Sequence, residues 1–162
     1  MEPPSFWWPL RAVRQNINMA QFFIEAAKNS DALVPTSHYI TAAAIGLWSA
    51  IDIYIKKVNP KEKRASVEYP MLSGSASDWF KKNERLVNSI RHSRIHYAAP
   101  VEIASVVPPP HDSASSTSLL VFEGKRIEEI PITEVLSRLE AVCQRVNDLI
   151  SKQTGSESFD FR

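Results

Sequence analysis

The chain has 162 residues, of which 44% are hydrophobic and 23% are charged, as in ordinary globular proteins. This length fits one domain that can bury a core without disulfides or bound metals. The formal net charge of +1 predicts neither a nucleic-acid nor a membrane partner, so any such partner must recognise a local patch. The single cysteine, Cys143, excludes an intramolecular disulfide and suits a reducing compartment.

The first residues, MEPPSFWWPLRAVR, lack the basic start, apolar middle and small-residue cleavage site of a signal peptide. The most apolar stretch, residues 38–55, is nearly long enough to span a bilayer, but His38, Ser49 and Asp52 lie within it or at its edge. We interpret this stretch as a buried helix of a bundle. A cytoplasmic protein with no membrane partner is therefore expected.

Four segments carry apolar residues at the three- and four-residue spacing of amphipathic helices. We predict helices over residues 9–29, 36–57, 75–97 and 133–152. The second is apolar nearly all round, as in a central helix, and small residues such as Gly46 would permit close helix approach. Pro9 suits the first position of its helix, and Ser75 with Asp78 resembles a capping box.

The connections between these helices include two long ones, residues 58–73 and 98–118, and the second of these contains three consecutive prolines. Two short apolar runs flank Glu123-Gly124-Lys125 and predict a small β-hairpin. The expected fold is therefore all-α, an up-and-down helical bundle of four main helices with a small β-hairpin inserted before the last helix. We expect one domain over residues 1–152 and a polar, disordered tail over residues 153–162.

The third predicted helix carries the densest cluster of ionisable and hydrogen-bonding side chains, in the run NSIRHSRIHY. Asn88, His92 and His96 are spaced i, i+4, i+8, so they stack along one polar face. Arg91 lies beside His92, and Arg94 completes the cluster. Arg91 and His96 are about 140° apart around the helix axis, yet both can reach a ligand that lies across this face.

These residue types suit chemistry on phosphate. A guanidinium binds phosphate oxygens through two parallel hydrogen bonds and keeps its charge, whereas an imidazole exchanges protons near neutral pH. Together they could cleave RNA: a histidine would help the 2′-hydroxyl attack the adjacent phosphate, or protonate the leaving oxygen, while an arginine stabilises the developing charge. The reaction needs no metal, and we predict neither a metal nor a cofactor.

The run Arg91-His-Ser-Arg-Ile-His96 matches the R-x4-H pattern of the HEPN superfamily, in which a polar residue, here His92, commonly follows the arginine. The position of the motif near the C-terminal end of the third of four helices is similar too. The resemblance implies a helical bundle that dimerises and places two motifs around one cleft. Many members resemble metal-independent endoribonucleases of toxin–antitoxin and defence systems, and others are inactive binding partners or scaffolds.

By this resemblance, Arg91 and His96 are the expected catalytic residues, and Asn88, His92 and Arg94 bind or position the substrate. The expected partners are a second copy of the chain, single-stranded RNA and an antitoxin or nucleotidyltransferase-like protein. The alternative is a non-catalytic HEPN-like helical protein that binds or scaffolds a partner protein.

Several polar features have competing interpretations. His92 and His96 have a spacing that could hold a metal, but there is no convincing third ligand. The basic residues between Lys56 and Arg64 could follow an RNA backbone, although we favour a solvated loop. Phe6-Trp7-Trp8 could stack on bases, although we expect it to pack on the core. Asp52 could cap a buried polar network or face the cleft.

Overall fold

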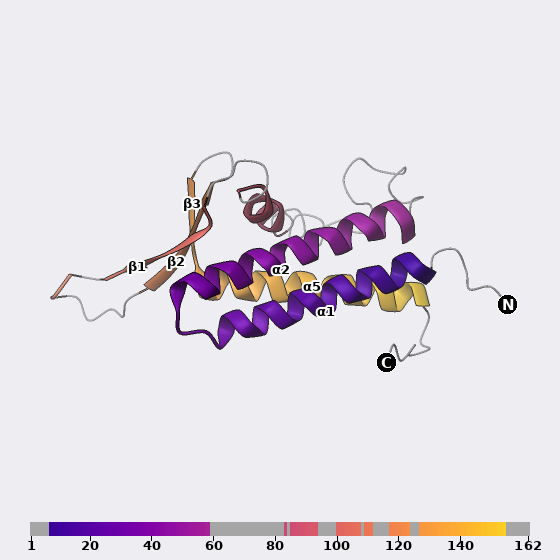
Figure 1. The fold of residues 1–162 in the computed structure, drawn as a ribbon, viewed down its shortest axis with the longest axis horizontal. Helices are drawn as coiled ribbons and strands as arrows, with labels where there is room; N and C mark the ends of the chain where they lie inside the picture. The colour runs from indigo at the N-terminus through magenta and orange to yellow at the C-terminus, as the bar shows by residue number, and fades with distance from the viewer. Residues whose placement is uncertain are drawn as a thin grey trace.

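The computed structural model shows a mostly helical chain, with three long helices side by side (Figure 1). It describes residues 7–58, 83, 85–93, 100–107, 109–111, 117–123 and 127–154. The long helices are α1 (Trp7–Lys28), α2 (Leu33–Ile53) and α5 (Ile132–Thr154), and a short π-helix, η1 (Tyr54–Val58), continues α2. Within the described residues, the predicted helical bundle is confirmed in outline.

The third predicted helix, residues 75–97, is described only in part. Residue 83 and residues 85–93 are helical, and the remainder, including the capping box, lies outside the described residues. Figure 1 shows this segment nearly end-on, so it runs across the direction of the three long helices. The helix that contains residues 85–93 is therefore neither parallel nor antiparallel to the three long helices.

The prediction for the start of α1 was slightly wrong. Pro9 is the third residue of the helix, which begins at Trp7. A proline is tolerated there because the N–H groups of the first turn have no acceptor within the helix.

The sheet has three antiparallel strands in the order β1 (Glu102–Val106), β2 (Thr117–Glu123), β3 (Ile127–Pro131). The pair β2–β3 is the predicted hairpin, whereas β1 corrects the prediction of a loop over residues 98–118. Ile103 is paired with Leu120, and both side chains face the core. The run of prolines suggested a loop, but it follows β1 instead of interrupting it.

The core combines apolar stripes from the helices with side chains from the sheet. Leu10, Leu47 and Leu139 are fully buried on the three long helices. The largest fully buried side chain, Phe122, comes from β2. The sheet therefore closes the end of the bundle at which α2 begins (Figure 1). No helix in the described part of the chain is both long and apolar enough to cross a bilayer.

Cys143 is buried on the apolar stripe of α5, as its place in the helical pattern predicts. Burial raises the pKa of its thiol to about 12, and the Glu140 carboxylate acts in the same direction. The thiol therefore stays protonated near neutral pH, so Cys143 is a packing residue and not a nucleophile.

Asp52 and Trp8, for which the sequence allowed competing interpretations, both lie on the surface. The Asp52 carboxylate does not cap a buried network, because it pairs with Lys56 one turn later at 2.7 Å and is 40% exposed. Trp8 does not pack on the core as expected, since 64% of it is exposed, and Phe6 lies outside the described residues.

At Gly46, α2 packs closely against α1. A Cβ atom at this position would lie 3.2 Å from the carbonyl oxygen of Asn16 and 3.3 Å from Cε of Met19. The methionine side chain can move, but the carbonyl oxygen can move only if α1 moves with it. Gly46 therefore sets the distance between the two helices.

We expect Gly46→Ala to lower the free energy of unfolding by about 1 kcal/mol. Alanine gains about 1 kcal/mol of helix propensity over glycine, but overpacking costs about 1–3 kcal/mol. Urea denaturation of the parent and the variant measures the difference. Ser49→Ala, at a half-buried position of the same helix, is the control and should not destabilise. A Gly46→Ala variant more stable than its parent would show that α1 and α2 can separate freely.

Candidate active site

The helical residues 85–93 are fixed by the core on one side. Leu86, Val87 and Ile90 are buried, and Ser93 at the end of the described segment is fully buried. These positions share one face at helical spacing, so the opposite, polar face has a defined orientation.

A second contact fixes the beginning of this segment. Nε of Arg138, on α5, donates a hydrogen bond of 2.7 Å to Oδ1 of the buried Asn83. Nη1 of Arg138 also pairs with Glu134 one turn earlier at 3.4 Å. A hydrogen bond with a charged donor is stronger than a neutral one, so this contact links the segment to α5.

Arg91 is held by two neutral partners. Its Cζ atom lies 5.2 Å from the centroid of the Trp48 ring of α2, which is cation–π distance. Its Nη1 donates a long hydrogen bond of 3.4 Å to Oδ1 of Asn88. All three side chains are half-buried, and no carboxylate among the described residues pairs with this guanidinium.

The contacts of Arg91 with other described residues leave its charge and most of its donors unused. A guanidinium has five N–H donors in a planar fork, and the contact with Asn88 uses one. The indole ring restricts the plane of the fork without cancelling the charge. Such a group can bind two oxygens of a phosphate.

The predicted site residues are only partly brought together in the described segment. Asn88 and Arg91 are in contact, and His92 is half-buried beside them in the chain. Arg94 and His96 lie outside the described residues, so the approach of His96 to Arg91 stays a prediction. No three potential metal ligands come together in the part of the chain that the structure describes.

Trp48 is the site residue that sequence reasoning missed. It fits the apolar spacing of the second helix, and nothing in that spacing separates it from core residues. The structure shows its ring half-buried and facing Arg91, 43 positions later in the chain. The available signal was chemical, since tryptophan is the best aromatic partner for a guanidinium, but no local pattern pairs the two.

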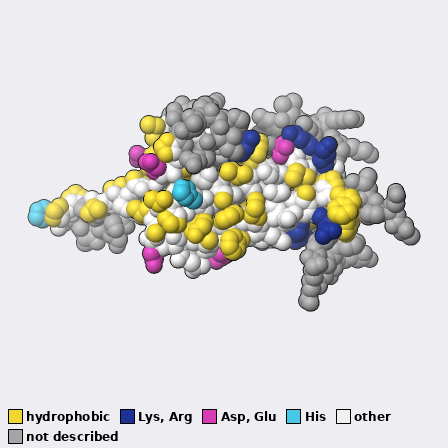
Figure 2. Space-filling view, in the orientation of Figure 1, with side chains coloured by type: hydrophobic (Ala, Val, Ile, Leu, Met, Phe, Trp, Pro, Cys, Tyr) yellow, Lys and Arg dark blue, Asp and Glu magenta, His cyan; other side chains and the backbone are white. Residues whose placement is uncertain are grey.

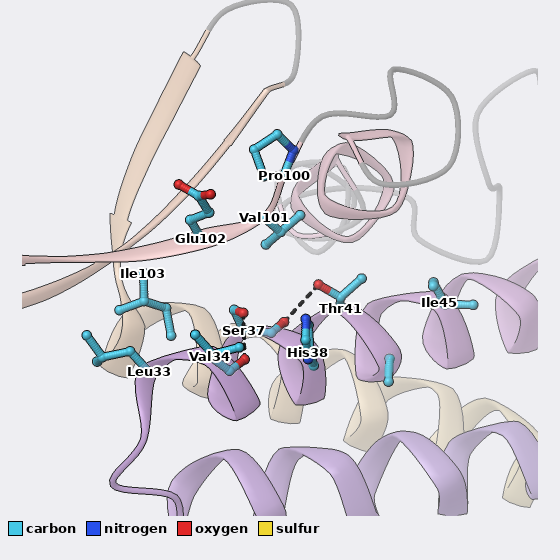
Figure 3. Close-up of a pocket in the computed structure, with 11 residues that line it drawn as sticks. Leu33, Val34, Ser37, His38, Thr41, Ile45, Pro100, Val101, Glu102 and Ile103 are labelled. Carbon is cyan, nitrogen blue, oxygen red and sulfur yellow. Dashed lines mark hydrogen bonds between the residues drawn. The ribbon is translucent and has the colours of Figure 1, made fainter.

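A groove of about 540 Å³ between α2 and the chain entering β1 is a second candidate (Figure 3). The hydroxyls of Ser37 and Thr41 on its floor donate to backbone carbonyls of Val34 and Ser37, both at 2.8 Å. His38 and Glu102 are its ionisable residues, and Figure 3 shows the Glu102 carboxylate turned away from α2. The groove therefore presents no acid–base pair, and the Arg91 cluster is the better candidate.

Comparison with known proteins gives no independent support for either site. No family model, curated protein or solved structure matches the chain. The HEPN resemblance thus rests on the R-x4-H motif and on the helical architecture.

We expect Arg138→Met to lower the free energy of unfolding by about 1.5–3 kcal/mol, because it removes a charged hydrogen bond to a buried amide. Chemical denaturation measures the effect. Arg145→Met is a matched control, since Arg145 is also half-buried on α5, and it should change stability by less than about 0.5 kcal/mol. Equal effects of the two substitutions would mean that the contact with Asn83 adds nothing beyond aliphatic packing.

Proposed function

We propose that the chain is a metal-independent endoribonuclease of HEPN type that cleaves single-stranded RNA through Arg91 and His96. The observation that supports this most directly is the setting of Arg91. Its guanidinium is oriented by Trp48 and Asn88, and both partners are neutral. A positive charge that is positioned but not neutralised is what binding a scissile phosphate requires.

In the proposed reaction, the 2′-oxygen of one nucleotide forms a bond to the adjacent phosphorus as the bond to the 5′-oxygen breaks. A base accepts the proton of the 2′-hydroxyl, and an acid gives a proton to the leaving oxygen. The products are a 2′,3′-cyclic phosphate and a 5′-hydroxyl. Arg91 stabilises the negative charge on the phosphate, and His96 exchanges the proton.

The remaining motif residues have supporting roles in this proposal. Asn88 orients Arg91 through the hydrogen bond described above, and His92 and Arg94 contact or position the RNA. One motif supplies a single His96 imidazole, so a cleft between two copies would provide one imidazole as base and another as acid. With this activity, the chain would act in the cytoplasm as a toxin or a component of a defence system. Its partner would be an antitoxin or a nucleotidyltransferase-like protein.

The alternative proposal is a non-catalytic HEPN-like protein that binds or scaffolds a partner protein. The observation that favours it is the same half-burial of Arg91, because an arginine that only packs on Trp48 would have similar contacts. The two proposals differ in what removing the charge would do. Loss of Arg91 would strongly slow cleavage in the first and alter only stability or partner binding in the second.

Cleavage of a single-stranded RNA by the parent chain is expected to survive EDTA and to leave cyclic phosphate ends. His96→Ala should slow it by roughly 10²–10⁴-fold, the usual contribution of a positioned acid or base. Arg91→Ala should be comparably slow, and Arg91→Lys should recover little because an ammonium lacks the planar fork. His92→Ala should have a smaller effect. Gel analysis of end-labelled RNA measures the rates and the product ends.

The control for this experiment is folding, since the variants must melt like the parent before a lost rate is assigned to chemistry. If both alanine variants cleave RNA as fast as the parent, Arg91 and His96 are not catalytic. The binding proposal would then replace the enzymatic one.

We also expect a homodimer, with the helices that carry Arg91 near the two-fold axis, because two-fold pairing is the commonest way to double a set of site residues. Light scattering coupled to size exclusion, at micromolar concentration, should give about twice the mass of the chain. A mass that stays monomeric up to the highest concentration used for cleavage would contradict the shared cleft.

A further inference from the structure

Aromatic and basic side chains meet at the end of the bundle where α1 begins. The rings of Trp7 and Trp8 are edge-to-face, with centroids 5.4 Å apart. Cζ of Arg11 lies 4.9 Å from the centroid of Trp7 and 5.4 Å from that of Trp8. Trp8 is 64% exposed, so this arginine–indole cluster presents a ring to solvent beside a positive charge.

The π-helix η1 adds two lysines to the same end, because it packs against α1. Lys57 is exposed, and Lys56 is exposed but pairs with Asp52. Figure 2 shows Lys and Arg side chains gathered at this end around an apolar patch, whereas the acidic side chains on this face lie mostly toward the other end.

The positive charge of α1 is not balanced along its first turns. Arg14 follows Arg11 by three residues, and no described residue accepts a hydrogen bond from its buried Nε. The first acidic residue of α1 is Glu25, near the opposite end of the helix. A ligand with several negative charges would therefore complement this surface.

We infer that Trp7, Trp8, Arg11, Lys56 and Lys57, here called the aromatic–basic end, bind single-stranded nucleic acid. An exposed ring can stack on an unpaired base, and cations beside it can contact the phosphates on either side. A duplex would not serve, because its bases are already stacked on one another. Every base has a flat face, so the binding would tolerate many sequences.

A membrane surface is the other class of partner that tryptophan and cations can recognise. The position of Arg11 argues against it, because its guanidinium lies over both indole rings. Inserting these rings among acyl chains would carry the charge with them, at a high desolvation cost. The same stack is undisturbed when a base adds to the exposed side of Trp8.

The inference does not rest on RNA cleavage, although it fits the proposed function. Lys56 follows Trp48 by eight residues, about 12 Å along a helix axis. One strand bound at the aromatic–basic end could therefore continue toward Arg91. The surface would then determine which substrates reach the candidate active site, namely single strands.

The test is fluorescence anisotropy of the full chain with a 5′-labelled, single-stranded DNA 12-mer of mixed sequence. DNA lacks the 2′-hydroxyl, so the proposed reaction cannot destroy this probe and binding is separated from catalysis. Trp8→Ala should weaken binding roughly 5- to 150-fold, which corresponds to the loss of one stacked base. Trp8→Phe keeps a ring and should retain most of the affinity.

The charge contribution is tested by the salt dependence of the same binding. Lys57→Ala should reduce the slope of log K against log salt by about 0.7, as expected for one phosphate contact on a single strand. Phe22→Ala and Lys28→Ala are matched controls elsewhere on α1. Phe22 is 67% exposed, and Lys28 is paired with Glu25 and Glu140, so both variants should bind like the parent.

The inference is overturned if the parent does not bind the probe, if Trp8→Ala binds as tightly as the parent, or if Phe22→Ala is equally damaging. Sedimentation with phosphatidylglycerol–phosphatidylcholine vesicles that depends on Trp8, without binding of the probe, would assign the surface to membranes instead. Binding of the probe by a chain that cleaves no RNA would uphold this inference and reject the proposed function.

Discussion

The close contact between α1 and α2 at Gly46 determines where both candidate surfaces lie. Two residues after Gly46, α2 presents Trp48 to Arg91, and beyond Ile53 it continues as η1 beside the first turns of α1. Because a glycine lets the backbones approach, a small change in the α1–α2 distance would displace Trp48 and the lysines of η1 together. The packing of two helices thus sets the positions of two clusters of cationic side chains.

Both clusters use the same physical arrangement, an arginine held against indole. Arg91 lies over Trp48, and Arg11 lies over Trp7 and Trp8. An aromatic ring restrains a guanidinium while leaving its net charge intact, whereas a carboxylate would neutralise it. Among the described residues, neither Arg11 nor Arg91 pairs with a carboxylate, whereas Lys28 pairs with Glu140 and joins α1 to α5. The charges of Arg11 and Arg91 are therefore available to a ligand, whereas the charge of Lys28 is used to join two helices.

Hydrophobic periodicity was sufficient to predict α1, α2 and α5 and the burial of Cys143, because long amphipathic stripes constrain a helix strongly. It was insufficient for β1, a five-residue strand in which four residues are exposed and only Ile103 packs against the core. Trp48 was missed for a related reason, since its partner is distant in sequence. Asn88 and Arg91 were both candidates because they lie in one polar cluster on one helix, and the structure adds a contact between these two residues, which are one turn apart.

The two edge strands of the sheet, β1 and β3, carry features that disfavour pairing with a further strand. β1 ends at Val106, and the three prolines that follow Val107 offer no N–H groups to a neighbouring strand. β3 carries Glu128 and Glu129 and ends at Pro131, which again combines charge with a missing donor. Open sheet edges invite pairing with other chains, and short strands, charges and prolines are the usual protection. The prolines that suggested a loop over residues 98–118 therefore also limit how far another strand could pair along this chain beyond β1.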